Sequence, residues 1–202
     1  MNRLKKGKSL IEDLKDYTVV DIETTGLDWN FNKILEISAL KVRDRKVVSE
    51  FSKIINPHEK IPYFIKNLTG INDEMASNSE ELIDVLMDFK EFLGNDIIVG
   101  HNVNFDINFL YDNFIKELNE PLTNDFVDTL KIARRLLKEL NHHRLDDITD
   151  YFNIEARDKH RALNDCVLTN KIYLHMCEIV YDRFASWENF KNNKIERGIQ
   201  WK

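Results

Sequence analysis

The segment Tyr17–Gly26 reads YTVVDIETTG, and it decides the fold because it joins a buried strand to a pair of acidic side chains. A short apolar, β-branched run that ends in turn-forming residues is typical of a strand inside a sheet. Side chains alternate along a strand, so Asp21 and Glu23 are expected on the same face, with their Cα atoms ~6.6 Å apart.

Two carboxylates on one buried strand need a compensating positive charge. Burying an unpaired charge is costly, and a second like charge beside it raises that cost. Divalent cations would remove the cost, and carboxylate oxygens without a neighbouring cysteine favour Mg²⁺ or Mn²⁺ over zinc. A D-x-E pair also occurs by chance at strand ends that face solvent, so this pair alone leaves both interpretations open.

The sequence around this strand predicts an α/β protein, with a sheet that helices cover. Ile34–Val42 and Val47–Ile55 flank a polar turn and indicate an antiparallel hairpin. Two further short strands, Asp96–Gly100 and Phe126–Asp128, alternate with helical patterns, and the second is expected at a sheet edge. The helical patterns cover Ser77–Leu93, Asn104–Leu118, Thr129–Leu140, Leu145–Phe152 and Ala162–Tyr181. The first of these begins with capping-box spacing between its serine and Glu80.

The 202 residues are enough for one well-buried domain, and 43% of them are hydrophobic. The expected division is an N-terminal basic segment at 1–16, one principal domain at 17–182, and a tail at 183–202 that is helical by pattern. The net charge of −6 counts against a nucleic-acid-binding protein, although cations held by carboxylates would weaken that objection. The basic clusters near both termini are expected to be solvated.

The chain has the features expected of a cytoplasmic protein. Its first residues, MNRLKKGKSLIEDL, contain no apolar run of signal-peptide length, and no window approaches a membrane span. Cys166 and Cys177 fall in one predicted helix and suit small buried positions in a reducing cytosol.

Two further motifs place reactive residues at the ends of elements. Asp106, in the sequence HNVNFD, falls in the first turn of a helix that directly follows a strand, although acids are also common there for local reasons. In HRALND, His160 and Asp165 would be ~140° apart on a continuous helix. They can act in one site only if His160 precedes the helix and Asp165 lies about one turn inside it.

The motifs DIETTGLD, HNVNFDINFL and HRALNDC, which begin at Asp21, His101 and His160, resemble the three exonuclease motifs of the DEDDh 3′–5′ exonucleases. That family includes the epsilon subunit of bacterial DNA polymerase III, ribonuclease T and oligoribonuclease. The resemblance extends over Tyr17–Tyr181, and Ile61–Ile71 is similar to the family's stretch between the first two motifs. It implies a ribonuclease H-like fold, with a mixed five-stranded sheet flanked by helices and a second strand that runs antiparallel.

The resemblance also implies hydrolysis with two divalent cations, Mg²⁺ or Mn²⁺, that removes nucleoside 5′-monophosphates from 3′ ends. The metal-binding residues would be Asp21, Glu23, Asp106 and Asp165, with Asp21 bridging both ions. His160 would be the general base, since an ordinary histidine pKa of ~6.5 suits proton transfer near neutral pH. The residues expected to contact substrate are Thr24, Thr25, Gly26, Leu27, His101, Asn102 and Phe105. For Leu27 and Phe105, burial in the core is the alternative.

The sequence favours DNA as the substrate and leaves RNA open as the alternative. Single-stranded DNA, cut during proofreading or repair, is the first choice because the motifs most resemble the epsilon type. An RNA-trimming exoribonuclease is the alternative, since no residue can be assigned from the sequence to a contact with the 2′-hydroxyl, the group that distinguishes RNA from DNA. A non-catalytic nucleic-acid-binding or polymerase-docking subunit is a third interpretation, which the complete set of five reactive residues disfavours. A DNA polymerase subunit is a candidate partner, no membrane is expected as a partner, and the oligomeric state is not indicated.

Overall fold

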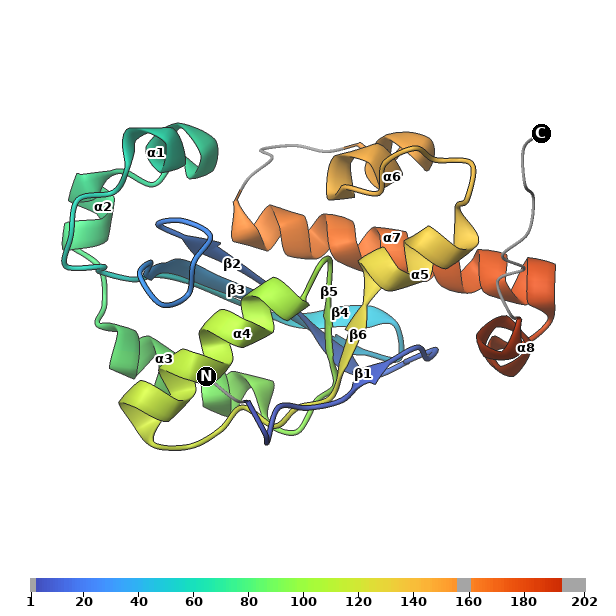
Figure 1. Ribbon diagram of the computed structural model, residues 1–202, viewed down its shortest axis with the longest axis horizontal. Coiled ribbons are helices and arrows are strands. Elements are labelled where there is room, and N and C mark those ends of the chain that lie inside the picture. The colour runs from blue at the N-terminus through green and yellow to red at the C-terminus, as the bar shows by residue number, and fades with distance from the viewer. Residues whose placement is uncertain (1–2, 156–160, 194–202) are drawn as a thin grey trace, which may run out of the picture.

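The computed structural model describes residues 3–155 and 161–193 and shows a six-stranded mixed sheet with helices on both faces (Figure 1). The strands are β1 (Ser9–Leu10), β2 (Tyr17–Thr24), β3 (Ile34–Arg43), β4 (Lys46–Ile54), β5 (Ile98–Gly100) and β6 (Phe126–Asp128). The helices are α1 (Tyr63–Thr69), α2 (Asp73–Ser77), α3 (Leu82–Leu93), α4 (Asn104–Asn113), the π-helical η1 (Phe114–Leu118), α5 (Thr129–Leu136), α6 (Leu145–Tyr151), α7 (Ala162–Phe184) and α8 (Trp187–Asn192). The strand order is β1-β6-β5-β2-β3-β4, in which β3 runs antiparallel to both neighbours and the other pairs are parallel.

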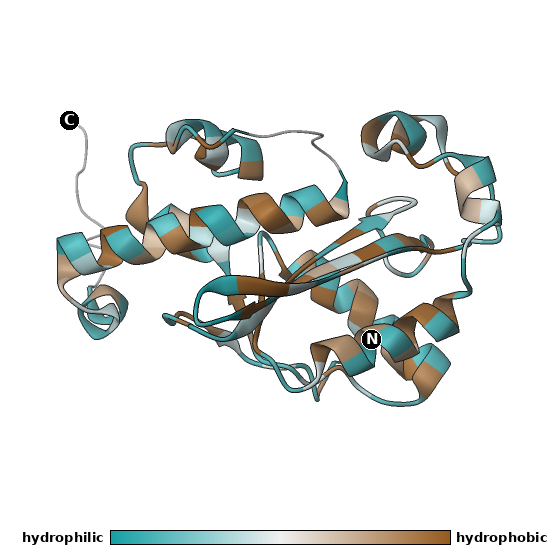
Figure 2. Cartoon of the chain, turned by 180° about the vertical axis from the view of Figure 1, so that it is seen from behind, coloured by the Kyte–Doolittle hydropathy of each residue, from teal (hydrophilic) through white to brown (hydrophobic). Residues whose placement is uncertain are grey.

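The central strand β2 divides its side chains between the two layers that cover the sheet. Tyr17 and Val19 pack with α5 and α7, whereas Val20 and Ile22 pack with α3 and α4. The strands carry apolar stretches that polar positions interrupt, and the helices also carry both kinds of residue (Figure 2). The alternation along β2 puts Asp21 and Glu23 on the α7 face, because both follow Tyr17 and Val19 by an even number of residues.

The predicted hairpin is confirmed, and its turn has the geometry of a tight β-hairpin. Asp44 and Arg45 both have left-handed backbone conformations, with φ of 47° and 62°. Two such residues between antiparallel strands form the type I′ turn that matches the twist of the sheet. The Asp44 N–H also donates a hydrogen bond to Asp16 Oδ1 at 2.8 Å.

The prediction of five strands is wrong by one, because the first ten residues contribute β1. Ser9 and Leu10 pair in parallel register with Phe126 and Val127. As a result β6 lies between β1 and β5, and the expectation that Phe126–Asp128 is an edge strand is also wrong. A strand of two residues is too short to show any periodicity in the sequence.

The N-terminal basic residues are not all solvated, contrary to expectation. The Arg3 guanidinium donates two hydrogen bonds to the Asp112 carboxylate, at 2.9 and 2.6 Å. Lys6 Nζ lies 3.0 Å from the side-chain oxygens of both Asn104 and Asn108. All three partners are on α4, so this segment is tied to the helix that carries the second motif.

The predicted helix 77–93 is interrupted, and the predicted capping box does not form. Ser77 is the last residue of α2, and its hydroxyl donates a hydrogen bond to the Glu74 carbonyl at 3.1 Å. Glu80 pairs instead with Ile55 beyond the end of β4, and its carbonyl accepts from the Asn56 N–H at 3.0 Å. The backbone of this segment therefore extends the sheet locally before α3 begins.

The other predicted helices are confirmed with shifted ends. The last turn of the predicted helix 104–118 is the π-helical η1, α5 ends at Leu136, and α7 continues to Phe184. Trp187 and Phe190 of α8 are buried against the core formed with α7. Cys166 and Cys177 are both buried and unbridged, as predicted. None of the helices in residues 3–155 and 161–193 has the length and apolar character of a membrane span.

Candidate active site

Three of the four predicted metal ligands meet where β2 ends and α7 begins. One carboxylate oxygen from each of Asp21, Glu23 and Asp165 lies within 4.8 Å of the others. The first two residues come from β2, and Asp165 comes from the first turn of α7, which starts at Ala162. Carboxylate oxygens gathered from two elements in this way can coordinate a divalent cation.

The fourth carboxylate, Asp106, reaches the same strand from α4. Its Oδ1 accepts a hydrogen bond at 3.1 Å from the N–H of Ile22, the residue between Asp21 and Glu23. Asp106 is only 4% exposed, and its charge contributes to the raised pKa of Asp21. The structure therefore brings together all four acids that the motifs contain.

The acids are poorly suited to being ionised together in the absence of a cation. Burial is the main cause that raises the pKa of Glu23 to about 8 and that of Asp106 to about 8. The pKa of Asp21 is raised well above its usual range, first by burial and then by the charges of Asp106 and Asp165. Bound divalent cations would supply the positive charge that this arrangement lacks, so the residues fit such a site.

These pKa shifts predict that the metal-free protein becomes less stable as the pH rises from about 6.5 to 9. Glu23 and Asp106 hold protons in the folded state that they have released in the unfolded state, so the stability they contribute is lost as pH rises through about 8. His101, whose pKa burial lowers to about 4, affects stability only below its ordinary value. The melting temperature in EDTA should fall by several degrees over this pH interval, because each kcal/mol of lost stability lowers it by ~2–4 °C.

Saturating Mn²⁺ is the control for this pH series, because cations that bind the ionised acids should reverse the loss. A Glu23→Gln variant should also show a shallower pH dependence in EDTA. A melting temperature in EDTA that is constant or rises over this interval would contradict the assigned pKa shifts.

The third motif has the helix boundary that the sequence required. Arg161 has an extended backbone, with φ −123° and ψ 125°, and α7 begins at the next residue. The helix therefore starts between positions 160 and 165, as predicted. His160 itself lies outside the described residues, so its part in the site stays a prediction.

The loop after β5 is held by a buried aspartate that the sequence analysis did not single out. Asp128 Oδ1 accepts hydrogen bonds from the N–H groups of Asn102 and Leu130, each at 3.0 Å. Asn102 has a left-handed backbone, with φ 58°. The His101 ring bridges two other segments: Nδ1 lies 2.9 Å from Thr129 Oγ1, and Nε2 lies 3.0 Å from the His143 carbonyl. The predicted substrate contacts of His101 and Asn102 stay predictions.

The predicted floor for the terminal nucleotide divides into buried and exposed residues. Thr24 and Thr25 are buried, and the Thr25 hydroxyl accepts from the Lys33 N–H at 2.9 Å. A Cβ on Gly26 would lie 2.5 Å from the side-chain oxygen of Asn32, so the loop leaves no room for a larger residue without a shift. Leu27 is 82% exposed and is not a core residue.

Phe105, on α4, is partly buried and packs against the core, with its ring centroid 5.0 Å from that of Phe109 on the same helix. The structure thus agrees with the core alternative for Phe105, and its stacking role stays a prediction.

A basic pocket of about 500 Å³ opens beside the β5 loop. Its walls include Asn102 and two exposed arginines, Arg134 and Arg144. His142 and His143 line it as well, and none of the residues that line it is acidic. The pocket therefore presents a positive surface at the loop that directly follows β5, in a chain whose net charge is −6.

Two charged residues beside the acids were not predicted from the sequence. Glu36 is a fully buried glutamate on β3, directly opposite Glu23, and Arg161 forms an ion pair with it. A signal was present: Glu36 is an acid inside the otherwise apolar run ILEISALKV. Its partner could not be found from the sequence, because the two residues are 125 positions apart.

The chain matches the family model described as Exonuclease over residues 18–173. It is 40% identical over 188 residues to the DNA polymerase III PolC-type of Oceanobacillus iheyensis, and 38% identical over 187 residues to that of Bacillus subtilis. These alignments cover 93% and 92% of this chain but 13% of the length of each relative.

Solved structures of low sequence identity share the fold. Exonuclease X in complex with 5′ overhanging duplex DNA matches with a TM-score of 0.66 and 22% identity, over 86% of this chain and 96% of that one. Exonuclease I of E. coli in complex with a dA16 oligonucleotide matches with a TM-score of 0.72 and 18% identity, over 88% and 42% of the two chains. These matches confirm the fold class.

Proposed function

The chain belongs to the exonuclease family, and from that membership we propose that it removes nucleoside 5′-monophosphates from the 3′ end of single-stranded DNA in a metal-dependent reaction. The observation that carries the proposal is the convergence of Asp21, Glu23 and Asp165 within 4.8 Å, with Asp106 against the same strand. No other group of three or more possible ligands is found in residues 3–155 and 161–193.

The roles of the residues follow from their chemistry. Asp21, Glu23, Asp106 and Asp165 would hold two divalent cations, Mg²⁺ or Mn²⁺, which when bound lower the pKa of the attacking water and neutralise charge on the scissile phosphate. His160 takes the proton from that water as general base. Because the four carboxylates would bind the cations, the proton is accepted by His160, a residue whose ordinary pKa is near neutral.

The substrate would extend from the loop after β2 to the basic pocket at the loop after β5. The exposed Leu27 contacts the terminal base from the loop after β2, while Thr24, Thr25 and Gly26 form the floor beneath it. Arg134 and Arg144 of the basic pocket attract the phosphates of the preceding nucleotides.

The similar PolC-type proteins are named as DNA polymerases, which supports DNA as the substrate and proofreading or repair as the setting. We propose on the same ground that the chain acts in the cytoplasm with a DNA polymerase, either as a partner or within one polypeptide. The chain spans 13% of the length of those relatives, so their full activity is not attributed to it.

Matched single-stranded DNA and RNA of one sequence, labelled at the 5′ end, test the proposal. With Mn²⁺, the DNA should shorten stepwise from its 3′ end, at least about tenfold faster than the RNA, because only RNA carries the 2′-hydroxyl. EDTA should stop the reaction, and free mononucleotides should be recovered. Faster shortening of RNA would support the RNA-trimming alternative. No release from either strand would support a non-catalytic binding subunit.

A further inference from the structure

Glu36 is a buried charge beside the acidic cluster that the proposed mechanism does not use. It is 0% exposed, and it is the cross-strand partner of Glu23 on the antiparallel strand β3. Directly opposed side chains on neighbouring strands lie on the same face of the sheet. Glu36 therefore adds a further negative charge to the face that already carries Asp21 and Glu23.

The carboxylate of Glu36 is fully engaged. Arg161 donates from Nη2 to Oε1 at 3.1 Å and from Nε to Oε2 at 3.3 Å. The Ser52 hydroxyl, on β4, also donates to Oε1, at 3.1 Å. A planar guanidinium that contacts both oxygens of a carboxylate is held in one orientation, and it also balances the negative charge.

The backbone of Arg161 holds the turn that carries Asp165. Arg161 is the extended residue before α7, and its carbonyl accepts a hydrogen bond from the Asp165 N–H at 3.1 Å. Cys166, the next residue, is buried with its Sγ 3.4 Å from the Ser38 carbonyl of β3. The first turn of α7 is thus anchored to β3 through Arg161 on one side of Asp165 and through Cys166 on the other.

We propose that Arg161, clamped by Glu36, is a positioning residue that sets the start of α7 and thereby places the Asp165 carboxylate against Asp21 and Glu23. This inference rests on the proposed function, because it assigns a role within the same metal site. Arg161 and Glu36 bind no substrate in this proposal. They act through Asp165, whose misplacement weakens the site even while the fold is intact.

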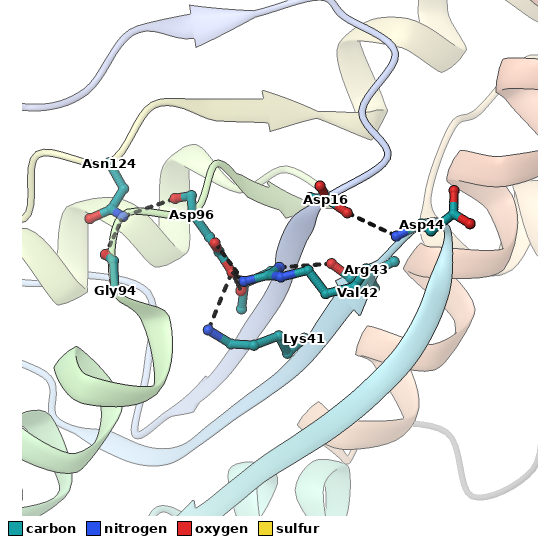
Figure 3. A network of polar contacts seen from close by, with 9 residues as sticks. Asp16, Lys41, Val42, Arg43, Asp44, Gly94, Asp96 and Asn124 are labelled. Carbon is teal, nitrogen blue, oxygen red and sulfur yellow. Dashed lines mark hydrogen bonds and ion pairs between the residues drawn. The ribbon is translucent and has the colours of Figure 1, made fainter.

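Arg43 provides a matched control at the opposite end of β3 (Figure 3). Its guanidinium donates to both oxygens of Asp96, each at 2.9 Å. The exposed fractions of the two arginine side chains are nearly equal, 38% for Arg43 and 39% for Arg161. Arg43 makes both contacts from Nη2 alone, whereas Arg161 uses Nη2 and Nε. Lysine at either position keeps the positive charge, but only at position 161 does it remove a two-pronged contact.

The melting temperatures of Arg161→Lys and Arg43→Lys should agree within about 3 °C. The two variants should nevertheless differ in kcat and in the Mn²⁺ concentration they require. For Arg161→Lys, kcat on single-stranded DNA should fall about 10- to 100-fold, and the half-saturating Mn²⁺ concentration should rise about tenfold. KM for the oligonucleotide should stay within about twofold of wild type, because substrate contacts are intact. Arg43→Lys should match wild type in all three.

The rise in melting temperature on addition of Mn²⁺ measures metal binding and requires no hydrolysis. It should be smaller for Arg161→Lys than for Arg43→Lys, and equal rises would overturn the positioning role. If Arg161→Lys does not fold, Glu36→Gln is compared instead, with the same expectations, since it keeps the side-chain shape and removes the charge. A wild-type protein that binds Mn²⁺ but hydrolyses nothing would refute the proposed function while leaving this comparison of Mn²⁺ binding intact.

Discussion

The Asp21→Asn variant will fold and will lose hydrolysis by about 10³- to 10⁴-fold, which corresponds to ~4–5.5 kcal/mol in barrier height. An Asp21 carboxylate oxygen lies within 4.8 Å of oxygens of Glu23 and Asp165, and the charge of the buried Asp106 also raises the pKa of Asp21. Asparagine keeps the shape of the side chain and removes the charge that a cation requires. Rates with saturating Mn²⁺ on single-stranded DNA measure the loss.

The same substitution should make the metal-free protein more stable at pH 8.5, because it removes repulsion among buried acids. The rise in melting temperature on adding Mn²⁺ should shrink or disappear. Glu50→Gln is the control, since Glu50 is an exposed carboxylate on β4 of the same sheet; it should leave hydrolysis and Mn²⁺ binding unchanged. Full activity in Asp21→Asn would exclude Asp21 as a metal ligand.

The His160→Ala variant should lose about 10²- to 10⁴-fold in kcat, the usual contribution of a positioned general base. Its rise in melting temperature on adding Mn²⁺ and its KM for DNA should be those of the wild type, because the four carboxylates are untouched. This combination separates a lost base from a lost metal site. The acid limb of the pH–rate profile, where protonated histidine is inactive in the wild type, should also disappear.

His175→Ala is the matched control for the histidine experiment. His175 lies on α7 ten residues beyond Asp165, where its ring stacks on Phe152 and its Nδ1 lies 3.6 Å from Glu178. Removing it should leave kcat unchanged. If His160→Ala retained full activity, the proton would have to be accepted by another group.

The parts of the fold that the sequence predicted are those with local signals. The strand of Tyr17–Thr24 and its hairpin partner were predicted from short apolar runs bounded by turn residues, and the alternation of side chains along a strand correctly placed Asp21 and Glu23 on one face. The start of α7 between positions 160 and 165 followed from helix geometry together with the hypothesis that His160 and Asp165 act in one site. The four acids were found because each lies in a short motif at the end of an element.

The parts that the sequence did not predict depend on distant partners. β1 has two residues and pairs with β6, more than a hundred positions away. Ser77 and Glu80 have capping-box spacing, but the Glu80 backbone pairs with Ile55, and that tertiary contact overrides the local pattern. Glu36 is visible as an unusual acid in an apolar strand, whereas its dependence on Arg161 is a property of the folded chain.

Because residues 3–10 are attached to α4 and β6, we expect them to unfold locally together with the candidate site. Arg3 and Lys6 bind α4, the helix that carries Asp106, and β1 covers the open side of β6, whose Asp128 holds the loop after β5. A fluctuation that peels this segment away would loosen α4 and expose β6 in the same event. We therefore expect the geometry of the acidic cluster to depend on a segment that contributes no carboxylate to it.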